Sequence, residues 1–377
     1  MKEIRVGVVG FGFMGRAHTF GYKTIPLYYR DLPFKITLAG VATPRLEVAQ
    51  RAAEELGFLK ATTDVDELLS DPNIDAVSIC TPNIFHMDGV TKALKAGKHV
   101  YCDKPLGATY AESLEVARLA EESGCVTQMA LQYRFYTGTL RAKQLMEEGR
   151  LGRVLSFRAA YLHPTGVNPD KPLGWKQQKQ FGGGGVLLDL GSHIFDLMYW
   201  MLGEYDSVMT NNTIVYPQRP GQNGGLVDVD AEDMSVSMVR MKSGAQGTIE
   251  ASKVATGTND ELRFEIHGTK GALYYNSTRP NELRFYDATQ PDMPYGGESG
   301  FKIIECVSRY ESPGGFFPGA KFASGFMRGH VHSLFNFLMH VHKDRPSAPS
   351  FADGAYISRV LEKAYESDGV RQWVKIV

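Results

Sequence analysis

The first part of the chain alternates short apolar runs with longer stretches in which apolar residues recur at helical spacing, such as 46–56 and 111–123. Strands that alternate with helices form βαβ units, and hence a parallel sheet with helices on both faces. We therefore predict an α/β Rossmann domain, mostly parallel and doubly wound, over residues 1–130. Its predicted strands are Ile4–Val9, Ile36–Ala42, Ala76–Cys80, His99–Cys102 and Val126–Ala130.

From about Gly152 the pattern changes to successive strands that are separated by short turns. Such connections favour an antiparallel sheet. A helix over Phe351–Ser367 and a strand over Gln372–Val377 are expected near the end. We therefore predict an α+β domain over residues 131–377, with a large, mostly antiparallel open sheet, for substrate binding and oligomerisation. Its predicted strands are Val154–Leu162, Val208–Val215, Met234–Met241, Ala245–Ser252, Leu262–His267 and Ala272–Asn276.

The composition excludes several classes of protein. The 377 residues are 43% hydrophobic and 22% charged, which suits two globular domains and excludes a disordered chain. Lys and Arg (41) balance Asp and Glu (42), so no positive field is expected to attract nucleic acid or a membrane surface. Four cysteines without CxxC spacing argue against a disulfide scaffold or a structural zinc site. With no signal-like leader and no long apolar run, we expect a cytoplasmic protein.

A glycine motif follows the first predicted strand directly and precedes a helical stretch. It reads Gly10-Phe11-Gly12-Phe13-Met14-Gly15. In that position the glycines allow a tight turn, close approach of a pyrophosphate and close packing of helix on strand, while the helix N-terminus supplies N–H donors. The motif predicts a dinucleotide site, and a glycine turn without a ligand is the alternative.

The end of the second strand bears on the choice of dinucleotide. It carries Thr43 and Arg45 and has no carboxylate of the kind that binds the ribose 2′-hydroxyl of NAD. An arginine can instead pair with the 2′-phosphate of NADP. The sequence therefore favours NADP over NAD, with the alternative that Arg45 only begins the next helix in solvent.

Three further segments, in this order and with the glycine motif, resemble the glucose–fructose oxidoreductase/inositol dehydrogenase (Gfo/Idh/MocA) family. They are Cys80-Thr81-Pro82-Asn83 followed by His86, then Cys102-Asp103-Lys104-Pro105-Leu106, and Gly183-Gly184-Gly185 followed by Asp189 and His193. Two positions depart from the family pattern. Asp103 stands where Glu is usual. Trp175-Lys176 resembles a Trp-Arg pair that reaches the cofactor in related enzymes, with Lys176 in place of the arginine.

The chemistry of an alcohol dehydrogenase can also be argued from the residue types. Oxidation of a secondary alcohol needs a base for the hydroxyl proton and a cation near the oxygen. His193 suits the first role and Lys104 the second, while Asp189, four residues before His193 in a helix-like stretch, can orient the imidazole. The resemblance implies the same trio. The alternative is a helix-capping aspartate with a buried, non-catalytic histidine.

Other side chains are weaker candidates. Thr81, Asn83, His86, Asp103 and Trp175 are expected near the cofactor, and Arg134 near the substrate. His18 either approaches the cofactor or lies on the surface of the first helix, and His86 either starts a helix near the substrate or is exposed. Four histidines between His330 and His342 form i,i+2 pairs that do not share a helical face, so we expect no metal site.

We therefore expect an NAD(P)-dependent dehydrogenase that acts on a CH–OH group of a sugar, sugar derivative or cyclitol. The alternatives are an eliminase or glycosidase that oxidises its sugar only transiently, and a dinucleotide-binding regulator. We expect a homodimer or homotetramer through the second domain's sheet, as the resemblance implies. The alternation along Met234–Met241 agrees either with a strand that is half-buried on each face or with one face packed on a partner subunit. The aromatic-rich segment 277–328 is expected either to stack on sugars or to contact a neighbouring subunit.

Overall fold

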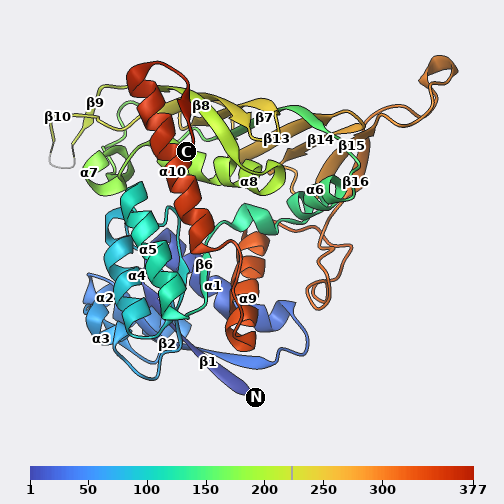
Figure 1. Cartoon of the computed structure of the whole chain (residues 1–377). Coiled ribbons are helices and arrows are strands. Elements are labelled where there is room, and N and C mark those ends of the chain that lie inside the picture. Colours follow the sequence, from blue (N-terminus) through green and yellow to red (C-terminus); the bar gives the residue numbers. More distant parts are fainter. Residues whose placement is uncertain (222–223) are drawn as a thin grey trace. The chain divides into compact units, whose positions relative to one another are not determined.

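The computed structural model describes residues 1–221 and 224–377 (Figure 1). They form two compact units. The first unit comprises 1–135, 310–320 and 325–358, and the second comprises 136–309, 321–324 and 359–377. The first continuous stretch ends at residue 135, against a division predicted at residue 130, and two later segments also belong to the first unit. The assignment of cofactor binding to 1–130 and of substrate binding and oligomerisation to 131–377 stays a proposal.

The first unit is built on a six-stranded parallel sheet in the order β3-β2-β1-β4-β5-β6, which confirms the predicted Rossmann fold. The strand order reverses between β1 and β4, and ligands of such sheets bind beyond the carboxyl ends of the strands at that point. The strands are β1 (Lys2–Val9), β2 (Phe34–Ala42), β3 (Ala61–Thr62), β4 (Ala76–Ile79), β5 (His99–Cys102) and β6 (Thr127–Met129). The helices between them are α1 (Phe13–Tyr28), α2 (Leu46–Leu56), α3 (Val65–Leu69), α4 (His86–Lys95) and α5 (Tyr110–Ser123).

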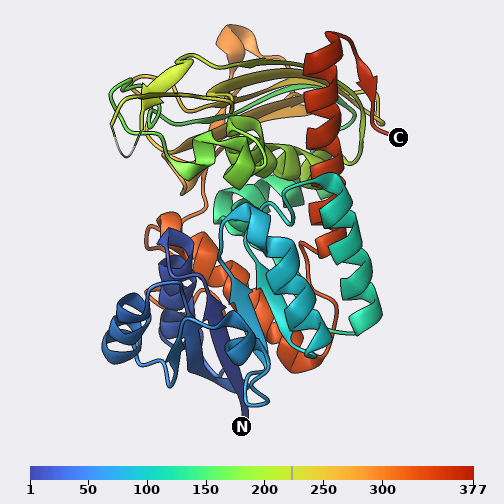
Figure 2. The ribbon, with the colours of Figure 1, turned by 90° about the vertical axis from the view of Figure 1, so that its left-hand side faces the viewer.

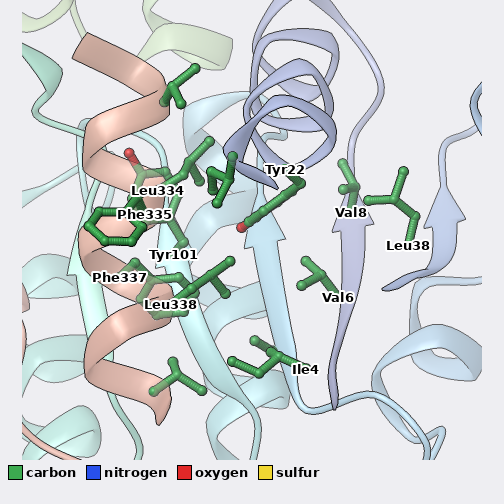
Figure 3. Packing of buried hydrophobic residues seen from close by; sticks show 14 of the residues in the cluster. Ile4, Val6, Val8, Tyr22, Leu38, Tyr101, Leu334, Phe335, Phe337 and Leu338 are labelled. Carbon is green, nitrogen blue, oxygen red and sulfur yellow. The ribbon is translucent and has the colours of Figure 1, made fainter. Parts of the chain in front are cut away.

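A helix from late in the chain, α9 (Phe326–Lys343), packs on α1 and completes the core of this unit. Its apolar side chains share one buried cluster with Tyr22 of α1 and Tyr101 of β5 (Figure 3). The two helices approach closely at Gly21, where a Cβ atom would lie 2.3 Å from Leu334 Cδ1. The contributing residues of α9 include Leu334, Phe335, Phe337 and Leu338.

The second unit is built on a nine-stranded sheet in the order β16-β15-β14-β13-β7-β12-β11-β8-β17. Among the described strands of this sheet, only β7 and β12 pair in parallel, so the predicted large, mostly antiparallel open sheet is confirmed. The strands are β7 (Val154–Leu162), β8 (Tyr205–Thr213), β11 (Met234–Met241), β12 (Gln246–Ser252), β13 (Glu261–Gly268), β14 (Gly271–Asn276), β15 (Glu282–Asp287), β16 (Lys302–Glu305) and β17 (Val374–Lys375). A separate pair comprises β9 (Gln218–Pro220) and β10 (Leu226–Asp228).

Helices α6 (Thr137–Glu147) and α8 (Ser192–Leu202) lie against one face of this sheet in both Figure 1 and Figure 2. Alternation along β11 matches that arrangement, since Ser235 and Val239 are buried whereas Val236 and Met238 are exposed. The other described helical segments are α7 (Lys179–Gly182), a π-helical segment (Leu187–Gly191), α10 (Phe351–Val370) and short turns at 83–85, 132–135, 175–177 and 294–296. Among the described residues, no helix has the length and apolar character that crossing a membrane requires.

Several predicted bounds change. The strand predicted over Val208–Val215 begins at Tyr205 and ends at Thr213, and the closing strand shrinks from Gln372–Val377 to Val374–Lys375. The aromatic-rich segment 277–328, for which no strand was predicted, contains β15 and β16. The helix-like stretch that carries Asp189 and His193 begins as a π-helical segment, Leu187–Gly191.

Candidate active site

The glycine loop after β1 has the geometry that a dinucleotide needs. Gly10 has φ +88°, and a Cβ atom there would lie 2.6 Å from the Cys80 carbonyl oxygen. A Cβ atom at Gly15 would lie 2.2 Å from the Gly10 carbonyl oxygen, whereas one at Gly12 would meet nothing within 4 Å. Gly12 is also the N-cap of α1 and supplies no side-chain cap. The backbone is therefore closely packed at Gly10 and Gly15. It is open at Gly12, at the helix N-terminus, where a phosphate group can approach.

The side chains of the same motif differ in their surroundings. Phe11 is buried and packs edge-on against Phe58, with ring centroids 6.0 Å apart. Phe13 is exposed, and Met14 is half-buried. Any contact of these residues with a phosphate therefore comes through the backbone, as the motif requires.

The end of β2 leaves its two candidates in different positions. Thr43 is buried, and its backbone N–H donates to the Thr62 carbonyl oxygen at 3.2 Å. Arg45 is exposed at the N-cap of α2. This position agrees with either expectation for Arg45, a 2′-phosphate contact or a plain helix start.

His86 ties together the loops that follow β4 and β5. It starts α4 and is fully buried, so the alternative of an exposed His86 is wrong. Its Nδ1 lies 2.7 Å from the Pro105 carbonyl oxygen and its Nε2 lies 2.8 Å from the Thr81 carbonyl oxygen. The imidazole therefore fixes the spacing of two loops that carry candidate residues.

Asp103 and Lys104 begin the loop after β5. The Asp103 N–H donates to the Ile79 carbonyl oxygen at 2.9 Å, and its Oδ1 accepts the Lys104 N–H at 2.9 Å. Lys104 is half-buried, and Asn83 of the preceding loop is also half-buried. The strand ends thus bring the segments around Gly10, Thr81 and Lys104 to one edge of the parallel sheet.

His18 lies inside the first unit, so the expected surface role on the first helix is wrong. Its ring is edge-on to Tyr101, with centroids 4.9 Å apart, and Nδ1 lies 3.1 Å from Cys80 Sγ. Burial, and secondarily the nearby His330, lower the pKa of His18 to about 3. The ring is therefore neutral at ordinary pH and belongs to the core behind the glycine loop.

In the second unit, Asp189 lies in the π-helical segment and His193 in the first turn of α8. The Asp189 side chain is 13% exposed and lies between two lysines, with Oδ1 2.8 Å from Lys176 Nζ and Oδ2 3.1 Å from Lys253 Nζ. His193 is buried, and its ring is edge-on to Tyr161 with centroids 5.7 Å apart. π-Helical turns inside helices often occur at functional sites.

The buried carboxylate of Glu232 anchors the start of this segment. Its Oε1 accepts the N–H of Gly185 at 3.1 Å, the N–H of Leu187 at 3.0 Å and the hydroxyl of Tyr365 at 2.7 Å. Cβ atoms at Gly184 and Gly185 would lie 2.2 Å from Tyr365 Oη and 2.3 Å from the Glu232 carbonyl oxygen. The glycine run is therefore required by close packing just before Asp189.

Two other candidates have partners that the sequence did not indicate. Trp175 is partly exposed, and the ammonium of Lys176 lies 5.5 Å from the centre of its ring. Arg134 is buried in the first unit, with Nη1 3.8 Å from Asp353 Oδ2.

Among the described residues, no three His, Cys, Asp or Glu side chains are grouped so that they could hold a metal ion.

Sequence reasoning missed Glu232, Tyr365 and Lys253. Lys253 follows β12, whose buried positions Ile249 and Ala251 alternate toward it. That period-2 pattern was visible in the sequence and would have placed a lysine on the buried face. No local sequence signal identifies Glu232 or Tyr365, because the backbone groups that they contact, at Gly185 and Leu187, are distant in the chain.

The chain belongs to the Gfo/Idh/MocA family of oxidoreductases, as its motifs indicated. A family model described as an oxidoreductase family with an NAD-binding Rossmann fold matches residues 4–131, and the GFO/IDH/MocA C-terminal domain matches residues 139–274. The fold and the family thus define an NAD-binding oxidoreductase.

Among the relatives, levoglucosan dehydrogenase of Pseudarthrobacter phenanthrenivorans is 32% identical, over 100% of this chain and 99% of that protein. Myo-inositol 2-dehydrogenase of Thermotoga maritima is 28% identical over 93% and 92%. A solved structure of levoglucosan dehydrogenase in complex with NADH and levoglucosan matches with a TM-score of 0.94 and 32% identity, covering 100% of both chains. An NAD binding oxidoreductase from Klebsiella pneumoniae matches with a TM-score of 0.94 and 32% identity, over 100% and 99%.

Proposed function

We propose that this chain is a nicotinamide-dependent dehydrogenase that oxidises a CH–OH group of a sugar, a sugar derivative or a cyclitol, or reduces the corresponding ketone. The observation that carries the proposal is Asp189, a mostly buried carboxylate held between two lysines and four residues before a buried histidine. A carboxylate next to a histidine in a proton-transfer site orients the imidazole and stabilises its charged form. Two of the relatives that match along the chain are a levoglucosan dehydrogenase and a myo-inositol 2-dehydrogenase.

The proposed roles follow from the residue chemistry. His193 takes the proton of the reacting hydroxyl, and Lys104 donates a hydrogen bond to the same oxygen as negative charge develops on it. Asp189 orients His193. When bound, the nicotinamide ring accepts the hydride that leaves the same carbon. Arg134 is proposed as a further substrate contact.

The cofactor is proposed to bind along the loops that follow β1, β2, β4 and β5. The uncapped N-terminus of α1 supports a pyrophosphate there. The Thr81 hydroxyl oxygen is buried and has no hydrogen-bond partner among the described residues, which leaves it available to a ligand. The proposed contacts are Gly10, Phe11, Gly12, Phe13, Met14, Gly15, Thr43, Arg45, Thr81, Asn83, His86, Asp103, Lys104 and Trp175.

We propose NADP as the preferred cofactor. No carboxylate follows β2, and the exposed Arg45 is available for a 2′-phosphate. The levoglucosan dehydrogenase structure contains NADH, so NAD is the alternative.

We also propose a cytoplasmic homodimer or homotetramer that associates through the sheet of the second unit. The support is the exposed apolar pair Val236 and Met238 on the face of β11 opposite the buried Ser235 and Val239. Exposed apolar positions on a regular sheet face are typical of a protein contact.

The test is a steady-state assay of reduced cofactor with levoglucosan, myo-inositol and other cyclic polyols, each with NAD⁺ and with NADP⁺. The proposal expects reduced cofactor to accumulate with at least one sugar, and expects His193→Ala and Lys104→Ala to abolish this. An eliminase would consume sugar without accumulating reduced cofactor. A regulator would bind the dinucleotide without consuming sugar.

A further inference from the structure

Lys253 is a buried lysine beside Asp189, at a position where the strand pattern puts apolar side chains. It comes two residues after the buried Ala251 of β12, and its side chain is only 10% exposed. A buried ammonium is costly unless it has a partner of opposite charge. Here the partner is the Asp189 carboxylate, whose Oδ2 lies 3.1 Å from Lys253 Nζ.

The two lysines on Asp189 differ in exposure. Lys176 lies in the short helical turn Trp175–Gln177 and is 47% exposed, against 10% for Lys253. An exposed ion pair is weak and exchanges readily with solvent or ligand. A buried pair does not exchange in this way, because its release would leave two charges unpaired away from water. Oδ1 of Asp189 is therefore paired with an exposed lysine and Oδ2 with a buried one.

Further polar groups gather around this pair at the ends of the parallel strands β7 and β12. The His163 N–H donates to the Ser252 carbonyl oxygen at 2.8 Å, and the Tyr161 hydroxyl donates to Asp260 Oδ1 at 2.7 Å. Burial lowers the pKa of His163, and so do the charges of Lys253 and Lys171, while Asp260 and Asp189 act in the opposite direction. Lys176 and Lys253 thus pair with Asp189 directly, and His163 lies near enough to feel the charges of Asp189 and Lys253 as well as those of Asp260 and Lys171.

We propose that Lys253 is the fixed positioning partner of Asp189 and that Lys176 is its exchangeable partner. A substrate hydroxyl replaces Lys176 at Oδ1 and donates to it, while Lys253 stays on Oδ2 and keeps the carboxylate ionised. The substrate class is then a polyol that has a second hydroxyl near the reacting carbon. This inference rests on the proposed dehydrogenase function.

The test compares four variants with wild type, namely Lys253→Met, Lys253→Arg, Lys176→Met and, as a matched control, the exposed Lys179→Met. Lys253→Met is expected to lower kcat/KM about 100-fold and to move the acid limb of its pH profile to higher pH, because Asp189 is then protonated more easily. Lys253→Arg is expected to recover about 10-fold of that loss, because the charge is kept. Lys176→Met is expected to lower KM about threefold with kcat nearly constant, because substrate no longer displaces a lysine.

The inference is overturned if Lys253→Met keeps the wild-type kcat/KM and pH profile, or if Lys176→Met and not Lys253→Met moves the acid limb. Thermal unfolding of each variant shows whether it is folded, and Lys253→Gln, which also removes the charge but keeps a polar end, replaces Lys253→Met if the latter is not. A ¹³C NMR titration of the Asp189 carboxyl carbon, identified by its loss in Asp189→Asn, needs no turnover. If wild type oxidises no sugar, the proposed function fails. The positioning role of Lys253 is then supported by a titration that moves to higher pH in Lys253→Met, and overturned by one that does not move.

Discussion

The carboxylate of Glu232 lies 3.1 Å from the backbone nitrogen of Gly185, and the missing side chain of that glycine makes room for it. The same oxygen holds the N–H of Leu187 at 3.0 Å. These contacts fix the entry to the segment that carries Asp189 and His193. The proposed catalytic pair thus depends on a residue that is not itself proposed to touch the substrate.

Replacing Glu232 should therefore damage activity through position. Glu232→Ala leaves the Leu187 N–H and the Tyr365 hydroxyl without this acceptor, while the Gly185 N–H keeps only Tyr365 Oη at 3.3 Å. Each buried group left unpaired lowers the free energy of unfolding by about 1–3 kcal/mol. It should also lower kcat about 10- to 100-fold, since small misplacements of catalytic groups are expensive. Denaturant unfolding and steady-state kinetics measure the two effects. Glu232→Gln, which keeps an acceptor oxygen, is the control and should retain most of both; equal kinetics for Glu232→Ala and wild type would contradict the positioning role.

Two glycines of the first loop should respond differently to alanine. At Gly15 the added methyl group would lie 2.2 Å from the Gly10 carbonyl oxygen, so Gly15→Ala should destabilise the fold by about 1–3 kcal/mol. At Gly12 it meets nothing within 4 Å, so Gly12→Ala should fold normally but bind dinucleotide at least about 10-fold more weakly, because the methyl group occupies the phosphate approach. Thermal unfolding and a fluorescence titration separate the two outcomes. Undiminished NAD(P)H binding by Gly12→Ala would place the cofactor elsewhere.

Cofactor choice is tested by titrating the protein in parallel with NADPH and NADH. If Arg45 binds the 2′-phosphate, NADPH binds more tightly, and Arg45→Ala weakens NADPH alone by about 10-fold. Arg51→Ala, which removes an exposed charge farther along α2, is the control. Equal or tighter binding of NADH by wild type would contradict the role of Arg45 and leave the fold unaffected.

Acid should destabilise the protein through three buried histidines of the first unit. Burial lowers the pKa of His18 to about 3, of His332 to about 3 and of His330 to about 4. Each folded-state pKa lies below the ordinary unfolded value of about 6.5, so the unfolded chain binds more protons at lower pH. The contribution of these histidines to the free energy of unfolding is then fully present above about pH 6.5. It decreases as pH drops toward 4, by up to about 1.4 kcal/mol per pH unit for each histidine.

His330→Phe tests this acid sensitivity directly. Neither ring nitrogen of His330 has a hydrogen-bond partner among the described residues, so the replacement leaves no donor or acceptor unpaired. Urea unfolding at pH 7.5 and pH 5 should show a smaller loss for His330→Phe than for wild type. His267→Phe, at a half-buried position on β13, should keep the wild-type difference. The same acid loss in all three proteins would exclude His330 as a contributor.

The elements of the parallel sheet and the glycine loop could be predicted because their signals are local. Apolar runs, helical spacing and the position of Gly10–Gly15 after a strand all lie within short windows of sequence. Helix α9 could not be assigned to the first unit from the sequence, because its partner α1 lies hundreds of positions earlier. The close approach of the two helices also depends on the missing side chain of Gly21, which leaves room for Leu334.

The candidate site was predictable only in part, for a similar reason. Lys104, Asp189 and His193 stood out through motifs, while Glu232 and Tyr365 act on Gly185 from 47 and 180 residues away. The π-helical turn at Leu187–Gly191 also escaped prediction, since the spacing of its apolar residues is also compatible with an α-helix. His18 and His86 were candidates in the sequence, but only the folded chain shows that both are buried.

The central claim is a net hydride transfer from a sugar carbon to the nicotinamide ring. A substrate sugar that carries deuterium at the reacting carbon tests it most directly, with mass analysis of the reduced cofactor. The proposed function predicts one deuterium in each reduced cofactor formed, and no reduced cofactor with His193→Ala. Consumption of the sugar with no accumulation of deuterated cofactor would contradict a dehydrogenase and favour transient oxidation followed by elimination.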